Sequence, residues 1–166
     1  MILPGRIAYA RGNLTNIRCA KSQIQPCGID LSLKQVLTLE SAGCIDFDNT
    51  HRQTAGSVVL PFTGETLEYV HLHQGVYLVE FNEFIRTPRN IMGQIFVRSS
   101  LFRSGIQIHA GVVDSGYQGV IGAMLKVENS FGLRVYKDAR LAQMVFHELT
   151  EPTEGYSGQY QGSAKL

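Results

Sequence analysis

Apolar and polar residues alternate along most of this 166-residue chain. The alternation is clearest over Asp30–Leu39, and short apolar runs follow at Ser57–Leu60, Gly75–Phe81 and Ile91–Val97. A period of two places successive side chains on opposite faces, which is the pattern of half-buried strands. The same pattern predicts further strands over residues 69–73, 83–88, 120–127, 132–136 and 141–148. No stretch carries a long 3.6-residue period, so the sequence predicts an all-β fold.

Turn residues and chain length limit which all-β architectures fit the sequence. The chain holds 17 glycines and 5 prolines, and Pro61 and Pro88 end two strands because proline has no N–H to donate to a sheet. Residues 99–104 are typical of one short helical turn with a serine N-cap. Strands this short and regular predict a jelly-roll-like sandwich or barrel. The length fits a single domain over residues 1–166.

Composition excludes several classes of protein. The net charge of +1 argues against binding nucleic acid through bulk charge. No apolar run approaches the roughly 18 residues of a membrane span, and no signal-peptide pattern begins the chain. We therefore expect a cytoplasmic protein without a nucleic-acid or membrane partner. Cys19, Cys27 and Cys44 are widely spaced and form no C-x-x-C pair, so we expect small buried apolar residues.

The segment Val97–Gly119 holds the candidate chemistry. Arg98, Ser99 and Ser100 offer a guanidinium and two hydroxyls to phosphate oxygens. Asp114 stands just before Gly116, which suits a carboxylate held at a tight turn near a ligand. A phosphate grip and a carboxylate are what metal-assisted hydrolysis of a nucleotide needs. From spacing alone, a hairpin whose polar ends face water explains these residues equally well.

Five stretches in order resemble the motifs of the trimeric dUTPase and dCTP deaminase superfamily. They are Gln25–Leu33 (QPCGIDLSL), Arg98–Arg103 (RSSLFR), His109–Gly119 (HAGVVDSGYQG), Lys137–Phe146 (KDARLAQMVF) and Tyr156–Ser163 (YSGQYQGS). The resemblance covers nearly the whole chain from Gln25 onward. It implies a distorted jelly-roll-like β-barrel with one short helix and a homotrimer with shared sites. It also implies that residues 150–166, which by composition alone are typical of a frayed terminus, form a lid over the nucleotide of a neighbouring subunit.

The resemblance also implies a role for each motif residue. Asp114 matches the general base that activates water, and Tyr117 matches the aromatic residue beneath the deoxyribose. The implied phosphate-binding residues are Arg98, Ser99, Ser100 and Gln143. The implied nucleoside-binding residues are His109, Ala110, Gly111, Val113, Tyr117, Tyr160 and Gln161. From its residues alone, His109 is more typical of a packed strand position than of a catalyst.

The metal and the remaining motif residues follow from the same resemblance. Mg²⁺ is the implied cofactor, held by substrate phosphates and water with few direct protein ligands. Asp30 would lie near this ion, and Arg103 is typical of the deaminase branch. Alternation places Arg140 and Gln143 on opposite strand faces, which makes Arg140 a structural residue.

One position departs from the deaminase pattern. Deaminases of this superfamily carry a catalytic Glu five residues after the glycine that Gly119 matches, and this chain has Met124 there. Methionine cannot transfer a proton to or from a cytosine ring. The nearest acid, Glu128, shares the strand face of Met124 but lies about 13 Å further along. A register shift of two residues would bring Glu128 into place.

The sequence therefore predicts a dUTP diphosphatase that converts dUTP to dUMP and pyrophosphate. Two alternatives stay open. The chain is a monofunctional or bifunctional dCTP deaminase if Glu128 reaches the pyrimidine, or it is a non-catalytic nucleotide-binding regulatory module. The regulatory module is disfavoured by the presence of Asp30, Arg98, Ser99 and Asp114.

Overall fold

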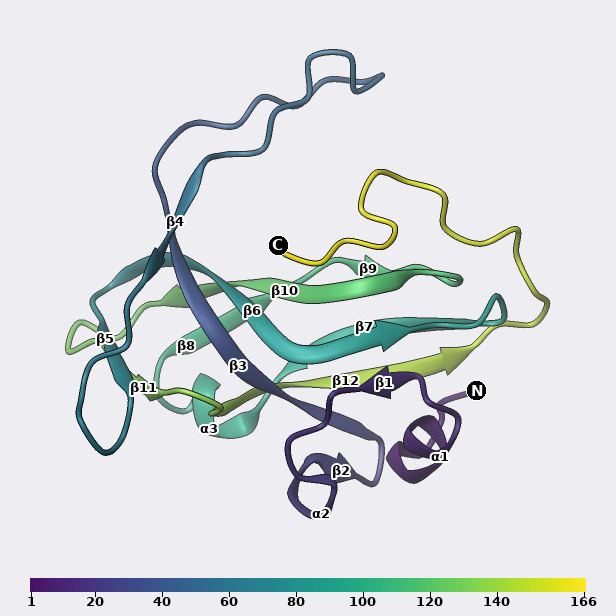
Figure 1. The fold of residues 1–166 in the computed structure, drawn as a ribbon, viewed down its shortest axis with the longest axis horizontal. Coiled ribbons are helices and arrows are strands. Elements are labelled where there is room, and N and C mark those ends of the chain that lie inside the picture. The colour runs from purple at the N-terminus through teal and green to yellow at the C-terminus, as the bar shows by residue number, and fades with distance from the viewer.

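The computed structural model describes residues 1–166, and strands make up most of its regular structure (Figure 1). The strands are β1 (Leu14–Thr15), β2 (Ile24–Gln25), β3 (Gly28–Leu39), β4 (Ser57–Leu60), β5 (Tyr69–Leu72), β6 (Gly75–Arg86), β7 (Ile91–Val97), β8 (Ile106–His109), β9 (Val112–Val113), β10 (Gln118–Val127), β11 (Leu133–Tyr136) and β12 (Arg140–Glu148). The helices are α1 (Gly5–Ala10), α2 (Ala20–Gln23) and α3 (Ser99–Phe102). No helix is long and apolar enough to cross a membrane.

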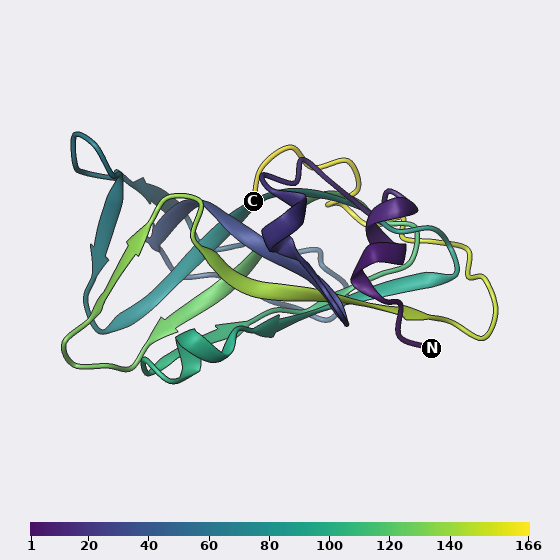
Figure 2. The ribbon, with the colours of Figure 1, turned by 90° about the horizontal axis from the view of Figure 1, so that it is seen from below.

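Ten strands form one large antiparallel sheet. Seven of them follow the order β8-β10-β6-β3-β12-β7-β9, while β1 pairs with β6 and both β2 and β4 pair with β3. Strands β5 and β11 form a separate two-stranded sheet. The large sheet curls into a half-barrel, which is visible when the molecule is seen from below (Figure 2). The predicted all-β fold is confirmed.

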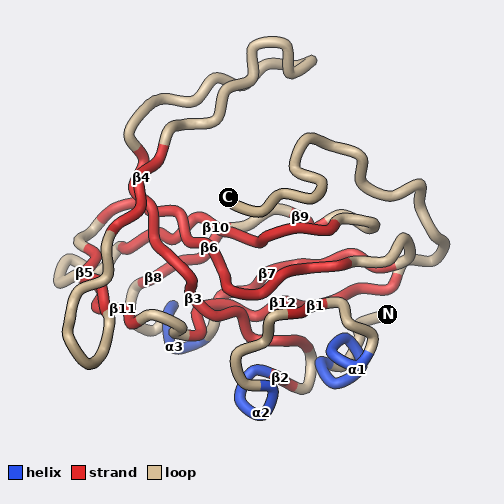
Figure 3. The backbone as a smooth tube through the Cα atoms, viewed as in Figure 1, coloured by secondary structure: helices blue, strands red, loops and turns tan.

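The prediction of one short helix is wrong, because three are present (Figure 3). The predicted helical turn is α3. Helices α1 and α2 have six and four residues, so neither is long enough to show a 3.6-residue period in the sequence.

The core fills the inside of the curled sheet. Its largest fully buried side chains include Phe81, Phe146 and Leu31, which come from β6, β12 and β3. Residues 28–33 of β3 are all buried, because this half of the strand has neighbours on both of its edges and both of its faces. Along β10, the odd-numbered residues are buried and the even-numbered ones are half-exposed, apart from the exposed Gln118 at its start, as the alternation predicts.

The three cysteines are exposed, so the prediction that they are buried is wrong. Cys19 precedes α2 and Cys27 lies in the turn between β2 and β3, while Cys44 lies in the long connection from β3 to β4. None of these positions belongs to a strand face, and so no sheet packs over the thiols.

Residues 40–56, which we call the arm, extend away from the body of the protein beyond β4 (Figure 1). The side chains of Ile45 and Phe47 are exposed on it. The outer part of the arm, beyond the bridge between Cys44 and Gln53, is tied to the C-terminal tail, where Arg52 Nη2 donates a hydrogen bond to Gln159 Oε1 at 2.6 Å.

Candidate functional site

A pocket of about 540 Å³ opens where the turn between β9 and β10 meets the C-terminal tail. Its walls come from the base of the arm, from β6 and β7, from the segment between Ala110 and Gly122, and from the tail. Most of the lining residues are apolar. An apolar pocket with a few polar side chains is typical of a small-molecule site. We call it the apolar pocket.

Six of the residues predicted to bind or act on a nucleotide line this pocket: Ala110, Gly111, Val113, Asp114, Tyr117 and Tyr160. Asp114 stands at the exposed end of β9. Its carbonyl oxygen accepts hydrogen bonds from Thr87 Oγ1 at 2.8 Å and from the Tyr117 N–H at 3.2 Å. The main chain of the turn is therefore fixed, while the carboxylate faces the solvent side, where a ligand would enter.

Tyr117 is held in the wall of the pocket. Its hydroxyl donates a hydrogen bond to the carbonyl of Val120 at 2.9 Å, and its ring meets Tyr156 of the tail edge to face, with centroids 5.5 Å apart. Burial raises the pKa of the Tyr117 hydroxyl, which keeps it neutral. A Cβ at Gly119 would lie 2.4 Å from the Tyr117 hydroxyl oxygen, so the ring position requires glycine there.

The C-terminal tail lies against the pocket of its own chain. The Gln161 side chain accepts a hydrogen bond from the Gln118 N–H and donates one to the Gly116 carbonyl, both at 2.9 Å. The Val120 N–H donates to the carbonyl of Ser163 at 3.1 Å, so the tail continues along the start of β10. Ligand binding by the tail, and a lid over a neighbouring subunit, stay predictions.

Asp30 forms a second, separate group of polar residues, which we call the Asp30 cluster. It comprises Asp30, Arg98, Arg140 and Gln143. Asp30 Oδ2 is 3.1 Å from Arg98 Nε and 3.2 Å from Arg140 Nη1, and Oδ1 accepts from Gln143 Nε2 at 3.3 Å. Asp30 is 1% exposed, while the two guanidinium groups are each about a third exposed.

Burial dominates the protonation behaviour of Asp30. Removal from water raises the pKa of this carboxyl, although Arg98, Gln143 and Arg140 act in the opposite direction. The carboxylate thus lies below the surface and holds two cations that remain partly exposed. A pair of fixed guanidinium groups at a protein surface is well suited to bind phosphate oxygens in a bidentate manner.

The prediction that Arg140 and Gln143 point to opposite faces is wrong, because both side chains reach Asp30. The register of β12 against β3 shifts between Arg140 and Ala142. A β-bulge of this kind adds one residue to one strand and re-aims its side chains. Arg140 also donates to the carbonyl of Ser22, so it ties the N-terminal segment to the cluster.

The serines lie next to the cluster. Ser99 and Ser100 are exposed in the first turn of α3, and Arg98 occupies the N-cap without a side-chain capping bond. The expected serine cap is therefore not formed. Arg98 Nη1 donates to the carbonyl of Arg140 at 3.0 Å, which fixes one side of its guanidinium. Arg103 follows α3 and is exposed.

The Asp30 cluster and the apolar pocket lie far apart within one chain. Strands β7 and β9 pair with Gly93 opposite Val113, which places Asp114 beside Met92. Arg98 is six residues further along β7, or roughly 20 Å at the usual strand rise. Asp114 and Arg98 of the same chain therefore do not converge on one reacting atom.

Comparison with known proteins decides the family. A family model described as dCTP deaminase-like matches residues 6–149. This chain belongs to the dCTP deaminase-like family. A probable deoxyuridine 5'-triphosphate nucleotidohydrolase of Methanosarcina acetivorans is 42% identical over 149 residues, which cover 89% of this chain and 86% of the relative. The deoxyuridine 5'-triphosphate nucleotidohydrolase of Methanocaldococcus jannaschii is 37% identical over 142 residues, covering 86% and 89%.

A solved member of related structure supports the fold. The 2'-deoxycytidine 5'-triphosphate deaminase of Agrobacterium tumefaciens superimposes with a TM-score of 0.66 at 20% identity. The match covers 89% of this chain, which spans about half the length of that deaminase chain.

For a dCTP deaminase-like protein, the surroundings of Met124 are informative. Met124 is paired opposite His109 across β10 and β8 and lies on the same face of β10 as Gly122, which lines the pocket. His109 is exposed, and its Nε2 is hydrogen-bonded to Gln107 Oε1 at 2.8 Å. Glu128 follows the end of β10, is exposed, and forms an ion pair with Lys126 at 2.6 Å. β10 itself carries no carboxylate, and Glu80 of the adjacent β6, which is paired opposite Gly122, is already bonded to Lys34 and Gln35.

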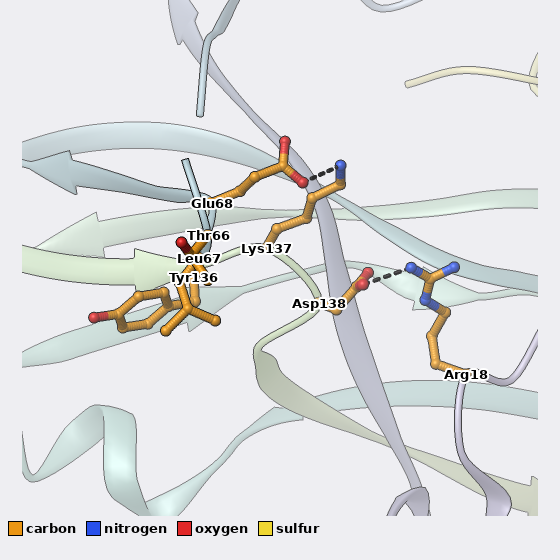
Figure 4. A pocket seen from close by; sticks show the side chains of 7 residues that line it. All are labelled: Arg18, Thr66, Leu67, Glu68, Tyr136, Lys137 and Asp138. Atoms are coloured by element: carbon orange, nitrogen blue, oxygen red, sulfur yellow. Dashed lines mark hydrogen bonds and ion pairs between the residues drawn. The ribbon is translucent and has the colours of Figure 1, made fainter. Parts of the chain in front are cut away.

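A second pocket, of about 370 Å³, lies at the turn between β11 and β12 (Figure 4). The residues that line it are Arg18, Thr66, Leu67, Glu68, Tyr136, Lys137 and Asp138. Its charges are already paired, since Arg18 contacts Asp138 at 2.5 Å and Lys137 contacts Glu68 at 2.6 Å. No motif in the sequence indicates this pocket.

Proposed function

We propose that this protein hydrolyses dUTP to dUMP and pyrophosphate. The observation that carries the proposal is Met124, which stands where deaminases of the superfamily carry their catalytic Glu, on the pocket-facing side of β10. A thioether cannot donate or accept the proton that deamination requires. The dUTP nucleotidohydrolases among the relatives, at 37–42% identity, support the same substrate.

Asp114 is the proposed general base. A water molecule held by its carboxylate attacks the α-phosphorus, and its proton passes to the carboxylate. The bond from that phosphorus to the oxygen that bridges it to the β-phosphorus breaks, and pyrophosphate leaves. The exposed position of the carboxylate at the mouth of the apolar pocket supports this role, and Tyr117 would lie beneath the deoxyribose.

The Asp30 cluster is the proposed phosphate site. Arg98 would donate to the phosphate oxygens while Asp30 fixes its guanidinium, together with the exposed hydroxyls of Ser99 and Ser100. Gln143 would present its amide beside them. Such preorganised donors stabilise the charge that develops on the phosphates.

The distance between the Asp30 cluster and the apolar pocket supports an active site that is shared between subunits. Asp114 must act at the α-phosphate and Arg98 must act on the same triphosphate, yet they lie roughly 20 Å apart within one chain. We therefore propose a homotrimer in which the Asp30 cluster of one subunit faces the apolar pocket of another. A closed ring of identical interfaces satisfies every subunit at once.

Mg²⁺ fits this arrangement as an ion held mainly by the substrate. No group of three or more His, Cys, Asp or Glu side chains could hold a metal ion, and the carboxylate oxygens of Asp30 already bind Arg98, Arg140 and Gln143. Asp114 is the carboxylate that remains free to approach a phosphate-bound ion through water. When bound, Mg²⁺ would neutralise charge on the triphosphate.

Product analysis with dUTP and dCTP tests the proposal. We expect dUMP and pyrophosphate from dUTP in the presence of Mg²⁺, and no product from dCTP. Asp114→Asn should abolish hydrolysis, while Glu128→Gln, which changes an exposed carboxylate outside the pocket, should not. Deamination of dCTP would contradict the assignment, as would an Asp114→Asn variant as active as the parent. A parent protein that turns over neither nucleotide would favour a binding module.

A further inference from the structure

A buried carboxylate lies behind the Asp30 cluster and has no place in the mechanism proposed above. Glu83 of β6 is 1% exposed. It lies on the same strand face as Phe81 and Ile85, which are core residues. A charged side chain almost never occupies such a position without a dedicated set of hydrogen-bond partners.

Three donors surround Glu83. Its Oε1 accepts from Gln23 Nε2 and from Ser32 Oγ, both at 2.6 Å, and its Oε2 accepts from the Ser32 N–H at 2.9 Å. The hydroxyl of Ser32 itself accepts from Asn82 Nδ2 at 3.0 Å, so its hydrogen points to Glu83. All three partner groups donate, and an ionised carboxylate, which only accepts, matches this set of donors.

This arrangement has a cost in stability. None of the three partners is charged, and burial raises the pKa of Glu83 in spite of the hydrogen bonds from Ser32 and Gln23. A glutamine or an apolar residue would avoid the cost of burying a charge without a cation. The position of the carboxylate therefore calls for a role other than stabilising the fold.

The bonds of Glu83 reach the main chain of β3 next to Asp30, through Gln23 of α2 and through Ser32 of β3. Gln23 Nε2, which donates to Glu83, also donates to the Asp30 carbonyl at 2.9 Å. Two residues later, the Ser32 N–H donates to the Glu83 carboxylate. Glu83 thus fixes the main chain that follows Asp30, directly at Ser32 and through Gln23 at the Asp30 carbonyl.

The backbone needs this support at this place. β3 pairs with β12 as far as Ser32 and with β6 from Leu33 onward, and both ladders are irregular there. Where a strand changes partners, some main-chain groups lose their ladder bonds and need side-chain partners. Glu83 provides one, so the direction in which Asp30 leaves the strand depends on it.

We propose that Glu83 is a positioning residue, which holds Asp30 and through it the Arg98 guanidinium in the orientation that grips the phosphates. The inference rests on the proposed phosphate role of the Asp30 cluster. Glu83 touches no substrate. Its effect travels through Gln23 and Ser32 to β3, and then through the 3.1 Å contact of Asp30 with Arg98.

The network continues away from the cluster. Asn82 Nδ2 also donates to Asp138 Oδ1 at 2.8 Å, and Asp138 pairs with Arg18 in the second pocket (Figure 4). This outer end is exposed to solvent. The inner end, at Glu83, is where a single substitution should reach the cluster.

The substitution Glu83→Gln tests the proposal. The new amide would place an NH₂ group against the N–H of Ser32 or the NH₂ of Gln23, so one donor would face another. We expect kcat for dUTP to fall on the order of 10- to 100-fold, as a misplaced phosphate-binding group requires. Calorimetric binding of inorganic pyrophosphate should weaken about tenfold, since it reports on the cluster without turnover.

Glu80→Gln is the matched control. Glu80 lies on the same strand, is fully buried, and accepts from Lys34, Gln35 and the Leu166 N–H, none of which contacts Asp30. Because Leu166 lines the apolar pocket, the comparison is made on pyrophosphate binding, and this variant should retain the parent's affinity for pyrophosphate. Equal losses in both variants would mean that burial alone explains the effect, and the proposal would be wrong.

The double variant Glu83→Gln with Asp30→Asn separates positioning from a general structural role. If Glu83 acts through Asp30, the second substitution should add less than about twofold to the loss in kcat caused by Asp30→Asn alone. If the losses in kcat of the two single variants multiply in the double variant, the two residues act independently and the proposal is wrong. If the parent binds pyrophosphate but does not hydrolyse dUTP, the proposed function fails, and weaker pyrophosphate binding in Glu83→Gln still supports Glu83. Unchanged pyrophosphate binding overturns the positioning role whatever the parent's activity.

Discussion

Replacement of Asp30 by Asn should lower the activity while hardly changing the stability of the fold. Asn has the shape of Asp and lacks its charge. Counting ion pairs leads to a different expectation, because Asp30 contacts Arg98 at 3.1 Å and Arg140 at 3.2 Å. Loss of one partner of a buried pair typically costs about 3–5 kcal/mol.

Two features of the cluster reduce that cost. The guanidinium groups of Arg98 and Arg140 are each about a third exposed and keep their bonds to the carbonyls of Arg140 and Ser22, so neither would be left as a buried bare charge. Burial raises the pKa of Asp30, which means that the surroundings as a whole favour the neutral form. Since Asn resembles that form, we expect the free energy of unfolding to change by less than about 1 kcal/mol at pH 7.

Urea and thermal unfolding of parent and variant, at equal protein concentration, measure this difference. For a domain of this size, 1 kcal/mol corresponds to a shift in Tm of about 2–4 °C. The equal concentration matters because association into the proposed homotrimer would raise the apparent stability. A loss of more than about 3 kcal/mol would refute the reasoning, because it would show that the ion pairs outweigh desolvation.

The pH dependence gives an independent check with a definite sign. A carboxyl whose pKa is raised in the folded state binds its proton more tightly there than in the unfolded chain. Its contribution therefore destabilises the fold above the folded pKa and disappears below the unfolded value. The parent should gain stability relative to Asp30→Asn as the pH falls from above the folded pKa toward the ordinary aspartate range. A parent that loses stability relative to the variant over this window would contradict the raised pKa.

Two further predictions follow from the turn and the tail. Gly116→Ala should loosen the tail and raise KM for dUTP, because Gly116 has φ +79° and a Cβ there would lie 2.8 Å from the Cα of Gly155. Faster protease cleavage near residue 155, with the Tm of the parent retained, would show the loosened tail. Glu128→Gln should leave the urea midpoint of the parent unchanged, since its ion pair with Lys126 is exposed. A lower midpoint would contradict this expectation.

Alternation in the sequence predicts most of the strands, because most of the sheet has one buried face. It does not predict where a ladder is interrupted. Arg140 and Gln143 are three residues apart, so a regular strand would separate them, and only the bulge between Arg140 and Ala142 brings both to Asp30. A bulge changes the pairing of two strands that are distant in sequence, and neither strand alone carries a signal for it.

The buried position of Glu83, in contrast, could be predicted from the sequence. It stands between Phe81 and Ile85 on what alternation makes a buried face, and an acidic residue at such a position indicates a buried polar network. The sequence does not indicate the partners, because Gln23 and Ser32 lie more than 50 residues earlier. The sequence also does not indicate that Thr54 and Ala55 of the arm line the apolar pocket, because this contact forms only when the chain is folded.

The central position of β3 has a consequence for synthesis of the protein. β3 lies between β6 and β12, and β12 also pairs with β7 and accepts the Leu3 N–H at the carbonyl of Phe146. A ribosome releases β3 about a hundred residues before β12, so one edge of β3 has no partner until β12 has been made. Such an open edge favours pairing with other chains. A chaperone that protects the nascent chain would therefore have to cover this edge of β3 until β12 emerges.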